Sequence, residues 1–407
     1  MTDSANNNER VLDIYLNDTE VGTLTLLPDD RTLFAFNKSY IENPDRPILS
    51  LWFKTPLAEL KTEEKIRRNA MLPPFFSNLL PEGHLREYLA KKANVKQGRE
   101  FFLLPALGKD LPGAVRIRSS QSIYYNEKQE SKLPENKRIF RFSLAGVQLK
   151  LSAIKESKDG LTIPADGTGG SWIIKLPSLS FKQLPEAEYS MLKLAEAIGI
   201  DVPECKLIPT ASIAGLPADI DTQIGDSLAV KRFDRASDGK RIHMEDFAQV
   251  FGLYPNQKYE ESSFDRIGYV ILSEAGEDDF FEYIKRLVFS VVIGNGDMHA
   301  KNWSLLYTDA HKPRLSPAYD FVPSVLFLPN DDLGLKLGGV KTFKEIRERN
   351  FAVLASRAAA SERQVLSLVR EASEQIHHAW KKMRSDLPLP AKLKTALDSH
   401  MKNLNIY

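Results

Sequence analysis

The 407-residue sequence has little cysteine and no long hydrophobic segment, and each absence excludes a class of protein. Its single cysteine, Cys205, excludes an internal disulfide and any metal site built from several cysteines, so we interpret this thiol as a small buried hydrophobic side chain. No apolar run approaches the roughly 20 residues that span a bilayer, and the polar start MTDSANNNER contains no hydrophobic signal region. We therefore expect a cytoplasmic protein.

The chain also lacks an excess of either charge and the commonest nucleotide-binding motifs. Its 55 basic and 54 acidic side chains leave a formal net charge of +1, so the overall charge argues neither for nor against nucleic-acid binding. There is no G-x-x-x-x-G-K-[ST] P-loop and no H-R-D catalytic loop, so neither a P-loop NTPase nor an ordinary eukaryotic-type kinase fits. No repeat of roughly 20 to 50 residues is present, which argues against a solenoid or a propeller.

The N-terminal part of the chain, residues 1–125, has the alternation of apolar and polar residues that is typical of strands. A turn at Asn17-Asp18 separates the first two alternating segments, which predicts a hairpin, and two further segments are candidates to extend it into a small antiparallel sheet. The four segments are residues 12–16, 21–27, 33–37 and 49–53. A polar stretch at residues 119–137 follows and predicts a linker or an exposed hairpin at the first domain boundary.

The remaining chain divides into a β-rich unit, residues 126–235, and a mainly helical unit, residues 236–407. Strand patterns at 138–154 and 172–176 lie in the first of these. In both units apolar residues at helical spacing predict amphipathic helices, and Gly199 supplies the left-handed residue that ends the first helix. The predicted helices cover residues 186–199, 278–293, 365–383 and 393–401. This order of strands and helices predicts an α+β fold.

The most informative segment is GNGDMHAKNWS, residues 294–304, which begins where an apolar helix is expected to end. Phosphoryl transfer needs metal ions that bridge the phosphates and a carboxylate beside the attacking hydroxyl. Asp297 can orient and deprotonate that hydroxyl, while oxygens of Asn302 and of Asp320, in SPAYDF, suit Mg²⁺. The alternative is a structural hydrogen-bond network, since Gly, Asn and Asp are ordinary turn residues. We interpret His299 as a residue that supports this loop.

A second group of candidate residues surrounds Lys175, which lies on a predicted strand. A lysine that projects from a half-buried strand needs an anionic partner, and the phosphates of ATP are suitable; Glu186 and Glu188 open the next helix. The alternative is a surface lysine that covers apolar residues with its aliphatic stem. Upstream, residues 144–150 are a candidate phosphate-covering loop, because Gly146 permits close approach of backbone N–H groups to a nucleotide.

Several motifs occur together in an order that is typical of one family. They are PPFFSNLLPEGHLREYLA, LPGAVRI, FSLAGVQLKLSA, WIIKLP, AVKRFDR, HMEDFAQ, GNGDMHAKNWS and SPAYD. This set resembles the HipA serine/threonine kinases, the toxins of bacterial type II toxin–antitoxin systems, over nearly the whole chain. The resemblance implies a two-lobed, protein-kinase-like fold with a small, mainly β N-terminal subdomain, a β-rich nucleotide-binding lobe and a mainly helical C-terminal lobe.

The same resemblance implies residue roles for the ATP- and Mg²⁺-dependent transfer of a phosphoryl group to a protein serine or threonine. Asp297 is the expected catalytic base, and Asn302 and Asp320 are the expected Mg²⁺ ligands. Ser143 matches the serine that family members autophosphorylate, which expels the glycine-containing loop and switches the kinase off. Lys231 stands where the family has an acidic residue, a change that a backbone contact to adenine tolerates. The ATP site is expected to include Ala145, Gly146, Val147, Gln148, Leu149, Lys150, Lys175, Lys231, Arg232, Phe233, His299, Asn302, Tyr319 and Asp320.

The resemblance also implies partners. A HipB-like helix-turn-helix antitoxin is expected to neutralise the toxin, and operator DNA is expected to be bound mainly through that antitoxin. The expected substrate is a protein, for which aminoacyl-tRNA synthetases are candidates, and no membrane is involved. Lys381, Lys382 and Arg384 are candidates for contacts to DNA phosphates, although a charge cluster on a helix is usually a solvated face.

Two alternatives from other functional classes stay open on the sequence alone. One is a catalytically inactive corepressor or scaffold module, against which the presence of Lys175, Asp297, Asn302 and Asp320 argues. The other is a metal-dependent phosphoesterase that uses Asp297, His299 and Asp320. A two-metal site of that kind needs more His or carboxylate ligands than this segment offers.

Overall fold

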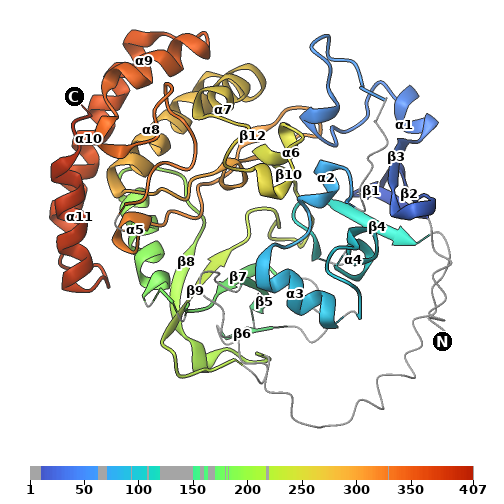
Figure 1. Ribbon diagram of the computed structural model, residues 1–407, viewed down its shortest axis with the longest axis horizontal. Helices are drawn as coiled ribbons and strands as arrows, with labels where there is room; N and C mark the ends of the chain where they lie inside the picture. Colours follow the sequence, from blue (N-terminus) through green and yellow to red (C-terminus); the bar gives the residue numbers. More distant parts are fainter. Residues whose placement is uncertain are drawn as a thin grey trace.

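The computed structural model (Figure 1) describes residues 11–62, 71–92, 94–107, 110–119, 150–155, 160–163, 170–178, 180–181, 183–216, 220–328 and 330–406. Within this part of the chain the strands form sheets of four, five and three strands. The four-stranded sheet lies at one end of the molecule, and the C-terminal helices lie at the other. Helices and separate antiparallel sheets together make an α+β fold, as the sequence predicts.

The four-stranded sheet confirms the predicted N-terminal hairpin. Its elements, with the helices that follow them, are β1 (Val11–Leu16), β2 (Thr19–Leu26), β3 (Thr32–Phe36), α1 (Lys38–Glu42), α2 (Pro74–Ser77), α3 (Gly83–Lys92), α4 (Glu100–Leu107) and β4 (Val115–Ser119). The strand order is β3-β2-β1-β4, and each neighbouring pair is antiparallel. Asn17 adopts the left-handed conformation (φ 52°) in the β1–β2 turn, which Asn tolerates better than most residues. Leu12, Ile14 and Leu16 are buried on one face, as the alternation predicts.

Residues 49–53 do not extend this sheet, so that part of the prediction is wrong. Leu51–Phe53 form a 3-10 helix that is capped by Ser50, whose hydroxyl accepts a hydrogen bond from the second amide group of the helix at 3.1 Å. The first amide group donates to Glu245 Oε1 at 3.0 Å. These backbone donors already have partners and are therefore not available to a neighbouring strand.

The five-stranded sheet forms the β-rich unit, in the order β6-β5-β7-β9-β8 with antiparallel neighbours throughout. Its elements are β5 (Lys150–Lys155), β6 (Leu161–Thr162), β7 (Trp172–Lys175), α5 (Leu184–Ala197), β8 (Cys205–Pro209) and β9 (Asp226–Lys231). Helix α5 confirms the predicted helix, and Gly199 has the expected left-handed conformation (φ 73°) just after it. Cys205 is buried, as the sequence interpretation expects.

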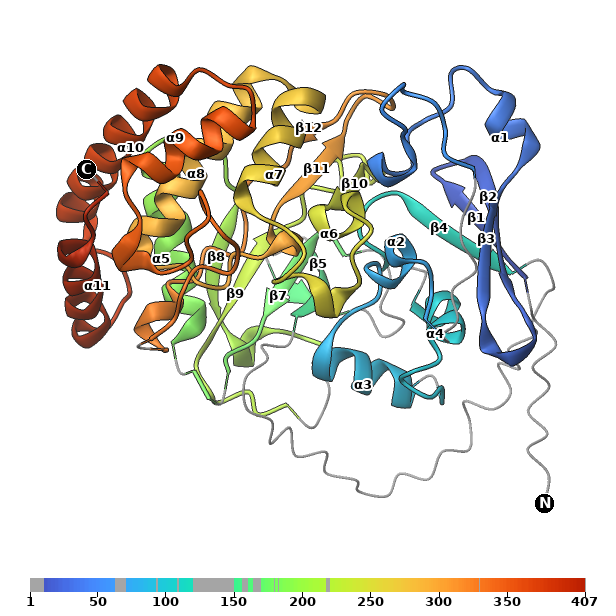
Figure 2. The same cartoon turned by 45° about the horizontal axis from the view of Figure 1, so that its top comes forward.

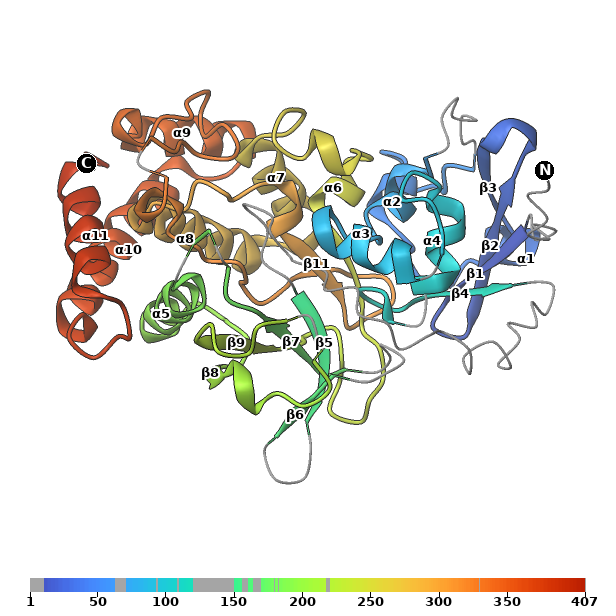
Figure 3. The same ribbon diagram turned by 60° about the horizontal axis from the view of Figure 1, so that its bottom comes forward.

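The last part of the chain is mainly helical, as predicted. Its elements are β10 (His243–Asp246), α6 (Phe247–Val250), α7 (Phe264–Val270), α8 (Glu277–Ile293), β11 (Ser304–Tyr307), β12 (Arg314–Leu315), α9 (Glu348–Arg357), α10 (Glu362–Met383) and α11 (Ala391–Asn403). Helix α10 packs against α8, α9 and α5, and α11 closes this end of the molecule (Figure 2). In Figure 3 the five-stranded sheet lies against the helical unit, with α5 beside α8. None of the helices in the described residues is long and apolar enough to cross a membrane.

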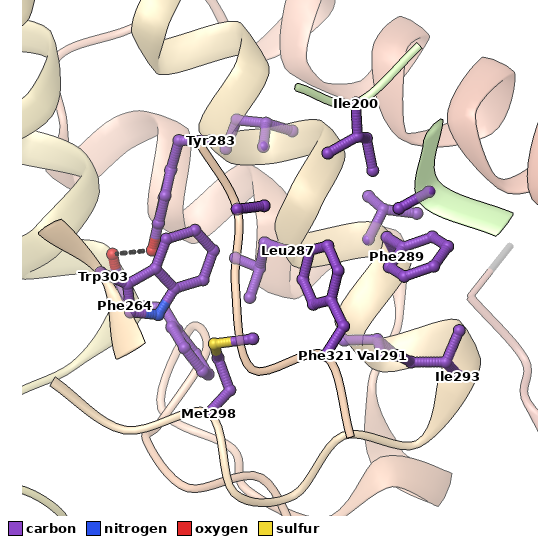
Figure 4. Packing of buried hydrophobic residues seen from close by; sticks show 14 of the residues in the cluster. Ile200, Phe264, Tyr283, Leu287, Phe289, Val291, Ile293, Met298, Trp303 and Phe321 are labelled. Carbon is purple, nitrogen blue, oxygen red and sulfur yellow. Dashed lines mark hydrogen bonds between the residues drawn. The ribbon is translucent and has the colours of Figure 1, made fainter. Parts of the chain in front are cut away.

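The core of the helical unit surrounds α8 and reaches the segments that carry the candidate site. Figure 4 shows Leu287 and Phe289 of α8 among buried side chains that include Met298, Trp303 and Phe321. Each of these last three is at most 3% exposed, and each is the chain neighbour of a residue predicted to act in phosphoryl transfer. Close packing in the core therefore fixes the backbone on which the candidate residues stand.

Candidate active site

Two lysines from neighbouring strands converge on one aspartate. Lys150 on β5 and Lys175 on β7 lie directly opposite each other in the antiparallel pair. Lys175 Nζ forms an ion pair with Asp320 Oδ1, and Lys150 Nζ lies 3.0 Å from Asp320 Oδ2. Two like charges opposite each other in a sheet repel and destabilise the strand pair. The Asp320 carboxylate offsets this repulsion between the two ammonium groups. A long-range contact thereby joins the β-rich unit to the helical unit.

Lys175 also has a carboxylate partner on α5. The lysine is 5% exposed and forms a second ion pair with Glu188, which is 1% exposed. The helix residue that pairs with Lys175 is thus Glu188, whereas Glu186 is only half-buried. Burial alone would lower the pKa of Lys175, but the carboxylates of Asp320 and Glu188 hold it above its ordinary value. The ammonium group therefore stays charged.

Asp320 has an uncommon backbone and an ionised side chain. Its φ of 56° lies in the left-handed region, which few residues other than glycine adopt. Asn295 Nδ2 donates a hydrogen bond to the Asp320 carbonyl oxygen at 3.2 Å, which helps to hold this conformation. Burial would raise the pKa of the carboxyl group, but the ammonium groups of Lys150 and Lys175 hold it well below its usual range. The two ammonium groups therefore favour the ionised form of the side chain, which is suited to bind a cation.

The loop that carries Asp297 begins where α8 ends. Gly294 takes the left-handed conformation (φ 71°) at the end of the helix, which turns the chain into the loop. Asn302 Nδ2 donates to the Asp297 carbonyl oxygen at 2.8 Å, and the His299 amide donates to the same oxygen at 2.9 Å. The nitrogen of the Asn302 side chain is thus used inside the loop, and its oxygen remains as the group for a ligand.

Asp297 is an exposed residue, although surrounding protein atoms partly desolvate its carboxylate. Tyr259 Oη donates a hydrogen bond to Asp297 Oδ1 at 2.5 Å. Desolvation by the surrounding protein raises the pKa of Asp297 above its ordinary value, and the hydrogen bond from Tyr259 opposes part of this rise. The negative charge of Asp320 adds to the rise. Asp297 therefore binds a proton more readily than an ordinary aspartate does.

His299 lies beside this carboxylate as a neutral ring. It is 7% exposed, and burial lowers its pKa to about 3. Its ring and the Tyr259 ring make a T-shaped contact, with the two centroids 5.0 Å apart and an interplanar angle of 82°. His299 would consequently meet a nucleotide as a neutral group and not as a cation.

The residues expected to contact adenine lie at and just after the end of β9. The Lys231 amide donates to the Glu204 carbonyl oxygen, and the Arg232 amide donates to the Ser171 carbonyl oxygen, each at 2.8 Å. The Arg232 side chain forms an ion pair with Asp234 at 2.8 Å. Because these two amide groups already have partners, an adenine contact from this segment would use other backbone groups.

Phe233 and Tyr319 bring this segment close to Asp320. Their ring centroids are 5.5 Å apart. Tyr319 Oη donates to the Lys301 carbonyl oxygen at 2.9 Å and lies 2.5 Å from Ser304 Oγ. Tyr319 immediately precedes Asp320, so these bonds fix the segment from which the Asp320 carboxylate projects.

Two domain families match this sequence. Residues 142–380 match the HipA-like C-terminal domain, and residues 12–118 match the HipA N-terminal domain. The chain belongs to the HipA family. Together the two matches cover both the N-terminal sheet and the candidate site, so the resemblance stated from the motifs is confirmed.

Relatives of this HipA-family chain include named kinases. The chain is 46% identical over 401 residues to the putative kinase Y4dM of Sinorhizobium fredii, which covers 98% of both chains. It is 25% identical over 351 residues to the serine/threonine-protein kinase toxin HipA of Shewanella oneidensis, over 76% of this chain and 74% of that protein. A chain in the solved complex of Shewanella oneidensis HipA, HipB and operator DNA superposes with a TM-score of 0.72 at 20% identity, over 96% of this chain and 95% of that one. This likeness confirms the two-lobed, kinase-like fold.

Part of the ATP site expected from the HipA resemblance lies outside the described residues. This applies to Ser143 and to residues 145–149 of the phosphate-covering loop. Lys150, the last residue of that loop, is described and reaches Asp320. The residues that the structure brings together are thus Lys150, Lys175 and Asp320 in one group, and Asp297, His299 and Asn302 in the adjacent loop.

Sequence reasoning missed three residues around the Asp297 loop, namely Tyr259, Lys258 and Glu82. Glu82, from the N-terminal unit, lies 2.8 Å from Lys258 Nζ and 2.9 Å from Lys301 Nζ. Burial would raise the pKa of Glu82, but the two ammonium groups lower it to about 2. Glu82 stands in PEGH, inside one of the motifs that carry the family resemblance, whereas Lys258 and Tyr259 stand in KYEE. All three are distant from the loop in sequence, and no pattern links them to Asp297.

Proposed function

We propose that this HipA-family chain is a toxin kinase that transfers the γ-phosphoryl group of ATP, with Mg²⁺, to a serine or threonine of a protein. The observation that carries the proposal is the convergence of Lys150 and Lys175 on Asp320, beside the loop of Asp297 and Asn302. Phosphoryl transfer is catalysed mainly by positioning and by stabilisation of charge, and these residues are suited to both.

Asn302 and Asp320 have the donor chemistry that Mg²⁺ requires. This small, hard ion is usually bound by one or two carboxylates together with phosphate oxygens, and the Asp320 carboxylate already attracts two ammonium groups. Bound Mg²⁺ would neutralise charge on the phosphates. Among the described residues no three His, Cys, Asp or Glu side chains form a group that could hold a metal ion, which a two-metal phosphoesterase would need.

The ammonium groups of the two lysines differ in how freely they can move toward a bound nucleotide. Lys175 is buried and paired with Glu188, so it would meet the phosphates from a fixed position. The Lys150 side chain is 44% exposed, and its flexible stem lets the ammonium group leave Asp320 for a phosphate oxygen. Both cations would then stabilise negative charge on the nucleotide, and the Asp320 carboxylate would be released to a metal ion.

Asp297 is suited to act as the general base. Its carboxylate is accessible, and desolvation raises its pKa, so it can accept the proton of an acceptor hydroxyl. The loop geometry keeps Asp297 and Asn302 together through the 2.8 Å hydrogen bond between them. The acceptor would therefore be deprotonated next to the group that helps to hold the metal.

Regulation and partners are proposed from the family likeness. Phosphorylation of Ser143 would add nearly two negative charges close to the phosphate site, which opposes ATP binding by repulsion. The solved Shewanella oneidensis assembly contains HipB and operator DNA, so we propose a HipB-like helix-turn-helix antitoxin as the partner of this chain. Aminoacyl-tRNA synthetases are candidate substrates, and the cytoplasm is the proposed location.

The test is incubation of the purified chain with γ-labelled ATP and Mg²⁺, with Asp297→Ala as the inactive variant. Asp386→Asn, a change of an exposed aspartate in the same unit, is the matched control. We expect label on protein for the parent and the control and none for Asp297→Ala, with mass spectrometry locating label on Ser143. Nucleotide binding without label would favour an inactive corepressor, and free phosphate without protein label would favour a hydrolase.

A further inference from the structure

Tyr259 makes the one side-chain hydrogen bond that the Asp297 carboxylate receives within the described part of the chain. Tyr259 Oη donates to Asp297 Oδ1 at 2.5 Å, and no described group donates to Oδ2. A carboxylate is free to rotate about its last side-chain torsion, so a donor on one oxygen decides where the other one points. The phenol thus leaves a single oxygen of Asp297 for an incoming hydroxyl.

Contacts other than the hydrogen bond to Asp297 also hold Tyr259 in place. The amide group of Ala300, in the loop of Asp297, donates to the Lys258 carbonyl oxygen at 3.2 Å. Lys341 Nζ donates to the Tyr259 carbonyl oxygen at 3.4 Å. The Tyr259 ring also packs edge to face with His299. Hydrogen bonds thus hold the backbone at Lys258 and at Tyr259, and the ring contact holds the side chain. The hydroxyl group is therefore kept in place beside the Asp297 carboxylate.

The surroundings of Lys258 add a second anchor. Lys258 Nζ lies 2.8 Å from Glu82, which also pairs with Lys301 at 2.9 Å. Lys301 lies inside the loop of Asp297, one residue before Asn302. One carboxylate thus ties the segment of Tyr259 and the loop of Asp297 to the same point on the N-terminal unit.

We propose that Tyr259 is a positioning residue for phosphoryl transfer, whose hydroxyl orients the carboxylate of the general base. This inference rests on the proposed kinase function. A general base must direct one oxygen at the hydroxyl that it deprotonates, and a group that holds its other oxygen acts through it, as a third residue orients the base of a catalytic triad. Tyr259 acts through the base, so it is a positioning residue and not itself a catalytic one.

Tyr259 is not a core residue. Tyr259 is 37% exposed, although large aromatic side chains in the cores of this protein are almost fully buried. Removal of its hydroxyl leaves the ring against His299 unchanged, so the change Tyr259→Phe isolates the hydrogen bond. Tyr269, which is 52% exposed on α7, provides a matched control for the loss of a phenol hydroxyl.

The experiment measures ADP formation by the full chain with MgATP, which counts transfer to any acceptor, including the protein itself and water. A lost hydrogen bond to a charged group predicts that Tyr259→Phe lowers kcat about tenfold, with the KM for ATP and the Tm within error of the parent. Tyr269→Phe should match the parent. In the Asp297→Asn background, Tyr259→Phe should cause no further loss, because the hydroxyl acts through that carboxylate.

Several outcomes would overturn the inference. A parent-like kcat for Tyr259→Phe would show that the hydroxyl does not position the base, while the kinase proposal would stand. Equal losses from Tyr259→Phe with and without the Asp297 carboxylate would point to a structural role. Phosphate on Tyr259 would make the phenol an acceptor instead. A parent that binds MgATP but forms no ADP would end the proposed function and this inference together.

Discussion

Asp320 and Asp297 are the two carboxylates of one candidate site, and the protein surrounds them in opposite ways. Asp320 lies between two ammonium groups, which hold its pKa well below the ordinary range. Asp297 has a neutral phenol as its partner, and desolvation raises its pKa. A side chain that binds a cation must stay ionised, whereas one that removes a proton must have some affinity for it. Opposed pKa shifts of neighbouring groups are a mark of divided roles in catalysis.

The two surroundings also come from different parts of the chain. The partners of Asp320 stand on β5 and β7 of the five-stranded sheet, whereas the contacts around Asp297 come from the segment after α6 and, through Glu82, from the N-terminal unit. Movement of the β-rich unit would therefore change the Asp320 surroundings first. A change at Glu82 would reach the Asp297 loop through Lys258 and Lys301.

The largest effect is expected from Asp320→Asn. This change removes the anion that holds Lys150 and Lys175 together and that would hold Mg²⁺, so nucleotide binding and turnover should both fall, the latter roughly 10³-fold. Isothermal titration with an ATP analogue, with and without Mg²⁺, measures the first effect. Mg²⁺-dependent binding as tight as that of the parent would remove Asp320 from the metal site.

The change Asp297→Asn is expected to lower the rate of phosphoryl transfer but not the affinity for the nucleotide. The amide retains the shape of the side chain and can still accept the hydrogen bond from Tyr259, but it cannot take a proton. We expect kcat to fall roughly 10³-fold with nucleotide affinity unchanged within about twofold. Single-turnover kinetics and titration on the same sample test this split, with Asp386→Asn as the control. A joint loss of binding and rate would contradict the division of roles between the two aspartates.

A smaller effect is expected from Glu82→Gln, which weakens the tie between the N-terminal unit and the Asp297 loop. The Glu82 side chain is 34% exposed, so we expect a loss of ~1 kcal/mol or less in unfolding free energy and a severalfold lower kcat. The matched control is Glu274→Gln, which removes an ion pair between Lys54 Nζ and Glu274 Oε2 at 2.6 Å. This pair also joins the N-terminal unit to the helical unit, but it lies away from the loop of Asp297. The control should destabilise the fold similarly and leave kcat unchanged.

The stability contributed by Glu82 should depend on pH with a defined sign. Its pKa in the folded protein is about 2, below the ordinary value of 4.5, so its contribution is complete above that ordinary value and is lost as the pH falls toward about 2. The difference in Tm between the parent and Glu82→Gln should therefore be constant at neutral pH and shrink in acid. A difference that grows as the pH falls would reverse this assignment.

The periodic patterns of the sequence predicted those strands and helices whose structure depends on residues close together in the chain. Alternation predicted β1 and β2, helical spacing predicted α5 and α8, and Gly199 predicted the end of α5. The apolar run at residues 49–53 misled the prediction because its backbone donors bind Ser50 and Glu245. The second of these partners lies almost 200 residues away, which no local pattern can reveal.

The candidate site shows the same limit. Asp297, Asn302 and Asp320 could be selected because their chemistry and order are those of phosphoryl transfer. Tyr259 could not be selected, because a tyrosine in a loop is common. Glu82 lies in a family motif, but its role could not be predicted, since only the fold brings Tyr259 to Asp297 and Glu82 to Lys301. The opposite pKa shifts of the two aspartates are likewise a property of their burial and partners, which the sequence does not record.

A crystal structure of the full chain with a non-hydrolysable ATP analogue and Mg²⁺ would test the proposed roles of Asp297 and Asp320 most directly. We expect Mg²⁺ bound to the side-chain oxygens of Asn302 and Asp320 at about 2.0–2.1 Å, with Lys175 in contact with a phosphate oxygen and Asp297 not bound to the metal ion. A metal ion or nucleotide bound elsewhere, with these groups still paired only to one another, would contradict these roles.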